Sequence, residues 1–239
     1  MDIPTQKPLA LLERIISCAS KEGDVVLDPF CGCGTAVHAA QRLGRIWIGI
    51  DVTHLAISLI ESRLVSAFPD VNYDLIGTPK DLAGARALGA RNKHQFELWA
   101  LSLVKAQPGN DRKKGADHGI DGIIWLRVGQ RERARVIVSV KGGFSVSVPM
   151  VRDLVGVLER EKAAIGLFVT LHPPTGPMKA EAAKAGFYQW EGERYPRVQI
   201  LTVEELLNGK RPDLPLIDHA ASVKQAPIDR APVTQHTLL

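Results

Sequence analysis

The sequence predicts an α/β protein built from two modules, and three observations lead to this prediction. Short apolar strands alternate with amphipathic helical segments along most of the 239 residues. This alternation weakens at 69–92, and from about residue 210 the chain becomes rich in proline. Since alternating strands and helices are typical of sheets covered by helices, we expect modules at 1–68 and 93–208, with a connector at 69–92 and a loose tail at 209–239.

Composition is that of a soluble globular protein. The apolar fraction of 45% is too high for general disorder. The longest apolar runs are far shorter than a membrane span, and the start of the chain does not resemble a signal peptide. Three cysteines are too few for a disulfide framework. We therefore expect a cytoplasmic protein with no membrane partner.

Charge gives only a mild preference for nucleic acid. The net charge is +4 and the isoelectric point about 9.0. Basic side chains gather in "DRKK" (111–114) and "RERAR" (131–135). Such clusters attract phosphate groups, although a charge run can equally be a solvated turn.

The first module is predicted to run helix, strand, glycine-containing loop, helix, strand, helix. Apolar residues at helical spacing predict a helix at 8–20, with a proline at its first position. "VVLD" (25–28) and "IWIGID" (46–51) are short strands, each followed by a helix, at 35–44 and 54–68.

The second module is predicted to begin with a helix at 94–106. Two strands at 119–128 and 135–141 flank a polar turn. A helix at 151–164, a buried strand at 165–171 and a helix at 178–186 follow, and a strand with a short helix at 197–207 ends the module.

The stretch "DPFCGCGT" (28–35) joins the first predicted strand to the next helix. Gly32 and Gly34 would let a ligand approach the backbone, and the helix N-terminus offers free N–H groups. Asp51 ends the second strand, where a carboxylate can accept two hydrogen bonds from ribose hydroxyls. The pattern therefore predicts a site for a nucleotide-like ligand.

Two other interpretations of this loop remain open. Cys31 and Cys33 could bind a metal, but C-x-C without a second Cys/His pair is poor zinc spacing, so we expect small loop residues. Asp51 could instead cap the helix that follows it.

Several stretches, "TQKP", "LLERII", "VLDPFCGCGTA" and "GIDV", occur in an order that resembles the β-class amino-group DNA methyltransferases. This family methylates adenine N6 or cytosine N4 with S-adenosylmethionine. The resemblance implies a partial Rossmann-like methyltransferase unit with that cofactor and with DNA as partner. The residues that it assigns to cofactor binding are Thr5 and Lys7 at the methionine end, Asp28, Phe30, Gly32, Gly34 and Thr35 in the loop, and Asp51 at the ribose.

The family's catalytic tetrapeptide, of the "DPPY" or "SPPY" type, has no counterpart in this sequence. In the β order it precedes "TQKP", where only "MDIP" stands, and Pro173-Pro174 lacks a following aromatic residue. Two parallel strands and their helices also cannot cover both faces of a sheet. We expect a fragment that does not methylate DNA alone: a gene remnant, a misplaced start, or a chain completed by another chain. A small-molecule methyltransferase is a further alternative.

"ADHGIDGII" and "VIVSVKGG" carry the second resemblance. Asp121 and Lys141 lie at strand ends across the predicted hairpin, where they could hold a divalent metal and position water at a phosphodiester. Residues 93–206 resemble the restriction-endonuclease-like fold, most closely its Mrr-type branch. The resemblance implies a nuclease-like site of Glu97, Asp121 and Lys141, with Asp121 as a ligand of Mg²⁺ and DNA as the substrate.

One position departs from that family pattern. Ser139 stands two residues before the lysine, where an acid, or glutamine in the Mrr branch, is expected. A hydroxyl is a poor ligand for a hard cation. We therefore expect DNA binding, with Lys141 and nearby basic residues such as Arg135 facing a DNA phosphate, and weak or absent cleavage. The alternatives are an Mrr-type endonuclease or DNA-binding protein with a vestigial methyltransferase segment, or a turn aspartate and a solvated lysine without a joint role.

Overall fold

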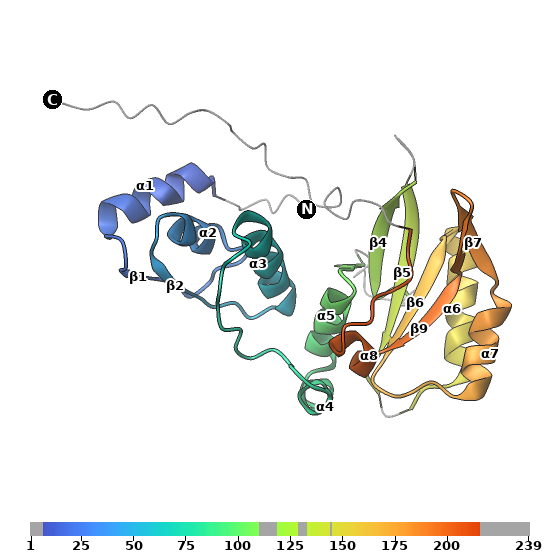
Figure 1. Cartoon of the computed structure of the whole chain (residues 1–239). Helices are drawn as coiled ribbons and strands as arrows, with labels where there is room; N and C mark the ends of the chain where they lie inside the picture. Colours follow the sequence, from blue (N-terminus) through green and yellow to red (C-terminus); the bar gives the residue numbers. More distant parts are fainter. Residues whose placement is uncertain (1–6, 110–118, 129–132, 144, 216–239) are drawn as a thin grey trace.

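The computed structural model of the protein describes residues 7–109, 119–128, 133–143 and 145–215, and these form two α/β modules (Figure 1). Thr5 and the basic segment 111–114 lie outside the described residues. Among the residues that are described, no helix combines the length and apolar character needed to cross a bilayer.

The first module has the predicted order of helices and strands. Its elements are α1 (Leu9–Ala19), β1 (Val25–Asp28), α2 (Thr35–Arg42), β2 (Ile46–Gly49) and α3 (His54–Ala67). β1 and β2 pair in parallel, with Val25 opposite Ile46 and Leu27 opposite Ile48. Parallel pairing brings the loop after β1 and Asp51, which follows β2, to the same end of the sheet.

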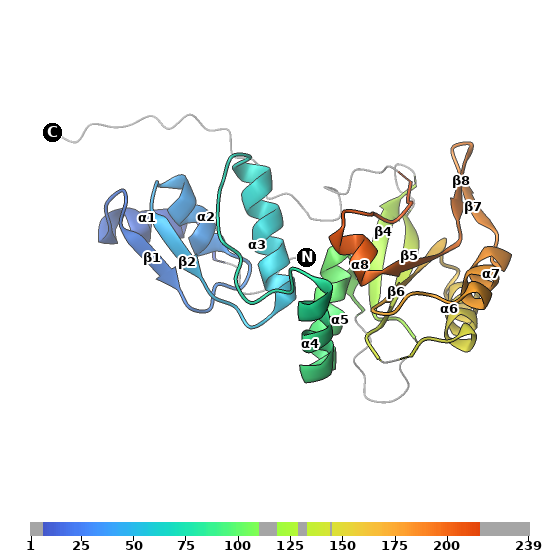
Figure 2. The same cartoon turned by 60° about the horizontal axis from the view of Figure 1, so that its bottom comes forward.

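The helices of this module pack on one face of its sheet. Val26 and Trp47 lie on that face and contact a small core formed with α1 and α2. Their neighbours Val25, Leu27 and Ile46 point to the other side and stay 58–59% exposed. In Figure 2 the two strands lie in front of α1 and α2, and no described element covers their near face.

The second module is a five-stranded sheet between two helical layers. Its elements are α4 (Leu82–Arg91), α5 (Lys93–Leu103), β3 (Gln107–Pro108), β4 (Gly122–Arg127), β5 (Arg133–Lys141), α6 (Val148–Glu161), β6 (Ile165–Thr170), α7 (Gly176–Lys184), β7 (Phe187–Trp190), β8 (Glu193–Pro196), β9 (Val198–Thr202) and α8 (Val203–Leu207). The strand order is β3-β4-β5-β6-β9, with antiparallel pairing from β3 to β5 and parallel pairing from β5 to β9.

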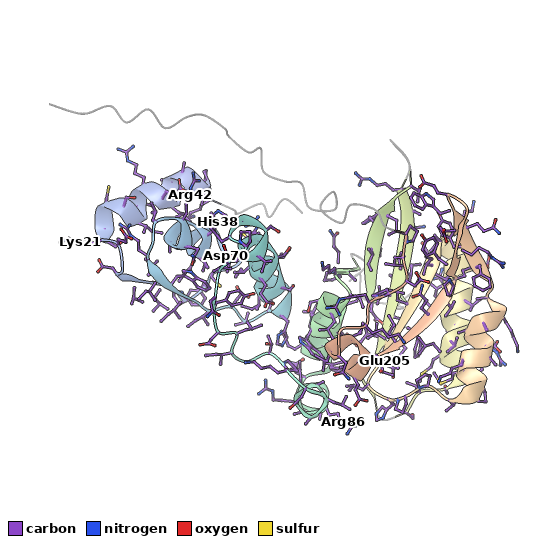
Figure 3. The ribbon with its side chains drawn as sticks, viewed as in Figure 1. Lys21, His38, Arg42, Asp70, Arg86 and Glu205 are labelled. Carbon is purple, nitrogen blue, oxygen red and sulfur yellow. The ribbon has the colours of Figure 1, made fainter. Side chains whose placement is uncertain are left out.

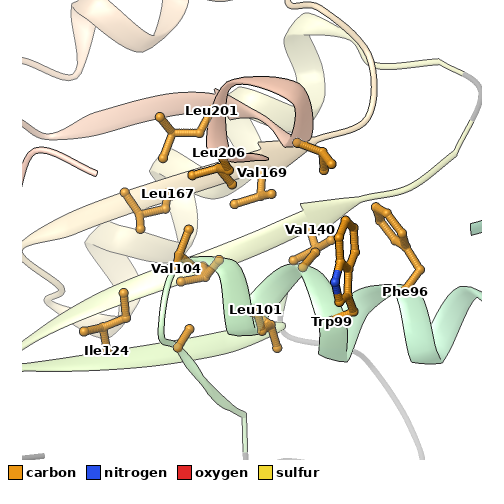
Figure 4. Packing of buried hydrophobic residues seen from close by; sticks show 14 of the residues in the cluster. Phe96, Trp99, Leu101, Val104, Ile124, Val140, Leu167, Val169, Leu201 and Leu206 are labelled. Carbon is orange, nitrogen blue, oxygen red and sulfur yellow. The ribbon is translucent and has the colours of Figure 1, made fainter. Parts of the chain in front are cut away.

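Alternation along β5 divides the core of this module into two layers. Val138 and Val140 face α4, α5 and α8, where Phe96 and Trp99 are buried (Figure 4). Ile137 faces the opposite layer, formed by α6 and α7. All six residues of β6 are buried, as expected for a parallel strand covered on both faces.

Four elements were not predicted: α4, the two-residue strand β3, and the paired strands β7 and β8. The segment 69–92, expected as a connector, contains α4, whose Ala85 and Leu88 are buried in the core of the second module. Alanine and glycine in α4 give too weak an apolar pattern to reveal a helix. The β7–β8 hairpin was missed as well; Glu191 and Gly192, both with positive φ, form its tight turn.

Candidate functional site

The glycine loop is anchored to the strand end that follows β2. The Gly32 N–H donates to Asp51 Oδ2 over 3.0 Å, and the Cys31 N–H donates to the Ile50 carbonyl over 2.9 Å. Gly34, with a φ of 77°, is the N-cap of α2. The free N–H groups of the first turn of α2 therefore begin directly beside the loop, in an arrangement suited to a polar or anionic ligand group.

Asp51 has a structural role that the sequence did not reveal. Its Oδ1 accepts hydrogen bonds from both the N–H and the hydroxyl of Thr53, each over 2.9 Å. Thr53, not Asp51, caps α3 by accepting from the Ala56 N–H, so the interpretation of Asp51 as the cap is wrong. A carboxylate has about four acceptor positions, and with Gly32 included three are occupied. One position is left, so a second ribose hydroxyl would have to displace an internal bond.

The remaining loop residues divide between interior and surface. Asp28 Oδ1 accepts from the Phe30 N–H over 3.2 Å, which shapes the turn, while the Phe30 side chain is 86% exposed. Thr35 is buried, with its Oγ1 3.5 Å from Cys33 Sγ. Lys7 is exposed ahead of α1. Among the loop side chains that the resemblance assigns to cofactor contact, Phe30 is the one most open to a ligand.

Both loop cysteines are buried packing residues in this structure. Burial raises the pKa of the Cys31 thiol to about 11, and the charges of Asp51 and Asp28 add to the shift. Across the described ranges, no group of three or more histidine, cysteine, aspartate or glutamate side chains is placed to hold a metal ion.

The burial of Cys31 predicts its reactivity. At pH 8 we expect iodoacetamide to label the exposed Cys18 about 100-fold faster than Cys31, because little thiolate exists at a pKa near 11 and burial blocks access. Mass spectrometry of peptides after brief alkylation measures both rates, and unfolded protein is the control. Equal labelling of the two cysteines in the folded protein would contradict the packing described.

The two glycines of the loop should respond differently to substitution. A Cβ at Gly34 would lie 2.5 Å from Ile60 Cγ1, whereas a Cβ at Gly32 would meet nothing within 4 Å. Both have positive φ, so each alanine costs about 1–2 kcal/mol of backbone strain, and overpacking adds about 1–3 kcal/mol at Gly34 alone. Hydrogen exchange of residues 25–50 measures the loss of local stability in each variant. Equal losses in Gly34→Ala and Gly32→Ala would refute the contact of Gly34 with Ile60.

The nuclease-like residues come together at one end of the second sheet. Asp121 directly precedes β4, and its N–H donates to the carbonyl of Val138, the residue before Ser139, over 3.0 Å. The Oδ2 of Asp121 accepts from the Val140 N–H over 2.6 Å and lies 3.9 Å from Lys141 Nζ. Since side chains alternate along a strand, Ser139 and Lys141 share one face of β5, and the Asp121 carboxylate lies beside Lys141 at the end of that strand. The expected proximity of Asp121 and Lys141 is found.

Glu97 reaches this group from α5. A Cβ at Gly142 would lie 2.5 Å from the Phe96 ring, so the missing side chain lets α5 approach the end of β5. Burial raises the pKa of Glu97, and the negative charge of Asp121 raises it further. Lys93, whose Nζ lies 3.7 Å from Glu97 Oε1, lowers the pKa of Glu97 and so opposes this rise, as do His94 and Lys141. Two carboxylates and one lysine thus share this end of the sheet, with the buried Ser139 beside Asp121.

Arg135 does not lie near Lys141, contrary to the expectation that both would face one phosphate. The two residues are six positions apart on β5, which corresponds to about 20 Å along a strand. Arg135 Nη1 lies 3.3 Å from Glu161 Oε2, and its guanidinium also donates to the Glu161 carbonyl. The expectation was wrong because "RERAR" leads into the start of β5, whereas Lys141 lies at the other end of that strand.

Both segments match protein families. Residues 2–62 match the family model described as DNA methylase, and residues 89–207 match that described as restriction endonuclease. The chain is 54% identical over 61 residues to the type II methyltransferase M2.DpnII of Streptococcus pneumoniae, covering 26% of this chain and 23% of that protein. It is 51% identical over 83 residues to M.HpaI of Haemophilus parainfluenzae, covering 34% and 26%. The chain therefore spans about a quarter of the length of these curated relatives.

Solved structures show local similarity. A complex of M1.HpyAVI with S-adenosylmethionine is 44% identical over 26% of this chain and 31% of that one, with a TM-score of 0.26. The restriction endonuclease FokI is 16% identical over 69% of this chain and 32% of that one, with a TM-score of 0.34. On the family matches, the chain joins a segment of the DNA methylase family to a domain of the restriction endonuclease family.

Proposed function

We propose that this chain is the S-adenosylmethionine-binding part of a DNA amino-methyltransferase, specific for adenine N6 or cytosine N4, fused to a nuclease-like DNA-binding domain. The observation that carries the proposal is the loop between β1 and α2, which Asp51 holds at the carboxyl end of two parallel strands. This is the position where ligands bind in open α/β sheets. The 54% identity to a type II methyltransferase in this stretch supports it.

The loop residues fit the proposed cofactor in part. The remaining acceptor position of Asp51 would take one ribose hydroxyl, and the exposed ring of Phe30 offers an apolar contact. Lys7 and Thr5 would hold the methionine end, as the family resemblance implies. When bound, S-adenosylmethionine supplies the activated methyl group; these side chains bind and orient it.

The proposal includes a division of labour between this chain and other residues. No "PPY"-type stretch occurs in the sequence, and Pro173-Pro174 follows β6 in the second module. Amino-group methylation requires a flipped base to be held by hydrogen bonds and stacking. We therefore assign cofactor binding to this chain and base binding to residues that it does not contain.

The second module would bind DNA through the end of its sheet that carries Lys141. With Asp121 and Glu97 nearby, Mg²⁺ could be held there, with Asp121 as a ligand, but Ser139 supplies no third carboxylate. The convergence of Glu97, Asp121 and Lys141 also favours a second candidate: an Mrr-type endonuclease with a vestigial methyltransferase segment. Retained cofactor binding would distinguish the first candidate from the second.

The test is the affinity for S-adenosylmethionine. Asp51→Ala should weaken binding by about 1.5–3 kcal/mol, because it removes a charged hydrogen-bond acceptor and releases the loop. Calorimetric titration measures this, with Asp70→Ala, an exposed acid just after α3, as the control (Figure 3). Equal affinities would leave Asp51 with a structural role only. No binding by the wild type would contradict the proposed function.

A further inference from the structure

Two hollows lie beside β9, the last strand of the five-stranded sheet, and the ring of Phe187 lines both of them. The first has a volume of about 710 Å³ and lies where β5 begins and just ahead of β6 and β9. The second, of about 680 Å³, follows β9 and reaches Leu171, directly after β6. Neighbours in the chain, Arg197 and Val198, line the first and the second hollow respectively. The two hollows therefore adjoin, and we call them together the edge groove.

The edge groove carries an excess of positive charge. Six cationic and three acidic side chains line it. Arg197 Nη1 lies 2.7 Å from Glu159 Oε1, so this cation is neutralised. Lys210 Nζ is neutralised in the same way by Glu205 Oε1, 2.6 Å away. Among the described residues, the other four cations form no ion pair; they are Arg133 and Lys162 in the first hollow, and Arg86 and Lys179 in the second. Such an excess attracts a polyanion.

The aromatic ring between the two hollows is open to solvent. Phe187 is 53% exposed, although phenylalanine is one of the residues most often buried. The guanidinium carbon of Arg194 lies 4.5 Å from the centre of this ring, which adds a cation at the same point. Both residues belong to the β7–β8 hairpin, which projects from the body of the second module (Figure 2). An exposed ring among cations is the combination with which proteins bind unpaired bases and the phosphates that join them.

The ring also decides which polyanion fits the edge groove. In a duplex the bases are stacked on one another, and a side chain reaches only the phosphates and the base edges in the grooves. Unpaired bases expose their faces, and each face can stack on an aromatic side chain. An acidic peptide would satisfy the cations but would leave the exposed ring without a matching planar group.

We propose that the edge groove binds single-stranded DNA, with unpaired bases against Phe187 and phosphates beside the four cations that form no ion pair. This goes beyond the DNA contact proposed at Lys141, because Arg133 lies eight positions earlier on β5, which corresponds to about 26 Å. The groove also leads toward that contact. The N–H of Leu171, which lines the second hollow, donates to the Lys141 carbonyl over 3.3 Å. A strand that follows the groove therefore arrives at the end of the sheet that carries Asp121 and Lys141.

Fluorescence anisotropy of the full-length chain with a labelled oligothymidine of about 15 nucleotides tests the stacking contact. Phe187→Ala should weaken binding at least about tenfold, because one stacked base is lost. Phe187→Tyr keeps an aromatic ring at the same point and should bind like the wild type. An abasic strand of the same length should bind the wild type at least about tenfold more weakly than oligothymidine does.

The phosphate contacts are tested by the salt dependence of the same binding. Arg133→Ala/Lys162→Ala should weaken binding and lower the slope of log K against log salt by about 1.4, since each phosphate contact on a single strand contributes about 0.7. Arg152→Ala/Lys184→Ala is the matched control. It removes the same charge from two residues outside the groove, both paired with Glu181, and should leave affinity and slope unchanged.

Several results would overturn the proposal. The first is a wild-type chain that does not bind oligothymidine, and the second is equal binding of the abasic strand. The third is oligothymidine binding that Lys141→Ala abolishes and Phe187→Ala does not change, which would assign all DNA binding to the Lys141 end. Equal weakening of duplex and oligothymidine binding by Phe187→Ala would contradict the preference for unpaired bases. Loss of duplex binding at Lys141 alone, with the groove still binding oligothymidine, would instead count against the proposed function.

Discussion

The isolated chain is expected to transfer no labelled methyl group from S-adenosylmethionine to mixed-sequence DNA. The reason is the absence of residues that could hold a flipped base: the sequence has no "PPY"-type stretch, and its one Pro-Pro pair lies in the other module. Cofactor binding by the loop does not replace this, because the acceptor amino group must be placed in line with the methyl group. Filter-binding of labelled DNA after incubation measures the transfer.

M2.DpnII, the relative that shares 54% identity in the cofactor stretch, is the positive control for this assay. Its signal should exceed that of the chain by several orders of magnitude, since correct positioning of two reactants alone is worth about 7–11 kcal/mol. Label in DNA that depends on the chain and disappears in Asp51→Ala would contradict the prediction. It would mean that other residues of this chain hold the target base.

The second large effect is expected on DNA binding when Asp121 or Lys141 is replaced. DNA binding should fall steeply with salt, and Lys141→Ala should weaken it and lower the salt dependence by about one phosphate contact. Asp121→Ala should instead tighten binding modestly, because Asp121 Oδ2 lies 3.9 Å from Lys141 Nζ and offsets its charge. Fluorescence anisotropy at several salt concentrations measures all three proteins. Lys21→Ala, in the first module, is the control (Figure 3).

Cleavage in the presence of Mg²⁺ should be weak or absent, because Ser139 cannot act as a third anionic ligand beside Asp121 and Glu97. Ser139 is 4% exposed and lies beside Asp121, so Ser139→Gln places the side chain typical of the Mrr branch at the same point. Plasmid nicking that appears in this variant would support an ancestral nuclease site. Nicking by the wild type that is lost in Asp121→Ala would contradict the prediction and show that two carboxylates suffice.

Much of the fold of this protein could be predicted from the local sequence pattern. Apolar periodicity and punctuating glycines predicted the order of elements in the first module and the two-module α/β division, and the family matches confirm the two resemblances. The proximity of Asp121 and Lys141 followed from alternation and from the single turn that joins their strands. In such cases the interacting residues belong to adjacent elements, so geometry within one hairpin or one βαβ unit decides the outcome.

Only the tertiary structure decided the contacts between residues far apart in sequence. α4 is a helix because Ala85 and Leu88 pack against the second module, not because its own pattern is strong. Arg135 pairs with Glu161 on α6, and Gly34 must lack a side chain because Ile60 on α3 lies against it. Three acceptor positions of the Asp51 carboxylate are occupied by hydrogen bonds from Gly32 and Thr53, and a sequence motif cannot show these bonds. The physical reason is common to all: close packing and hydrogen-bond satisfaction depend on which surfaces meet, and a local pattern specifies the surface but not its neighbour.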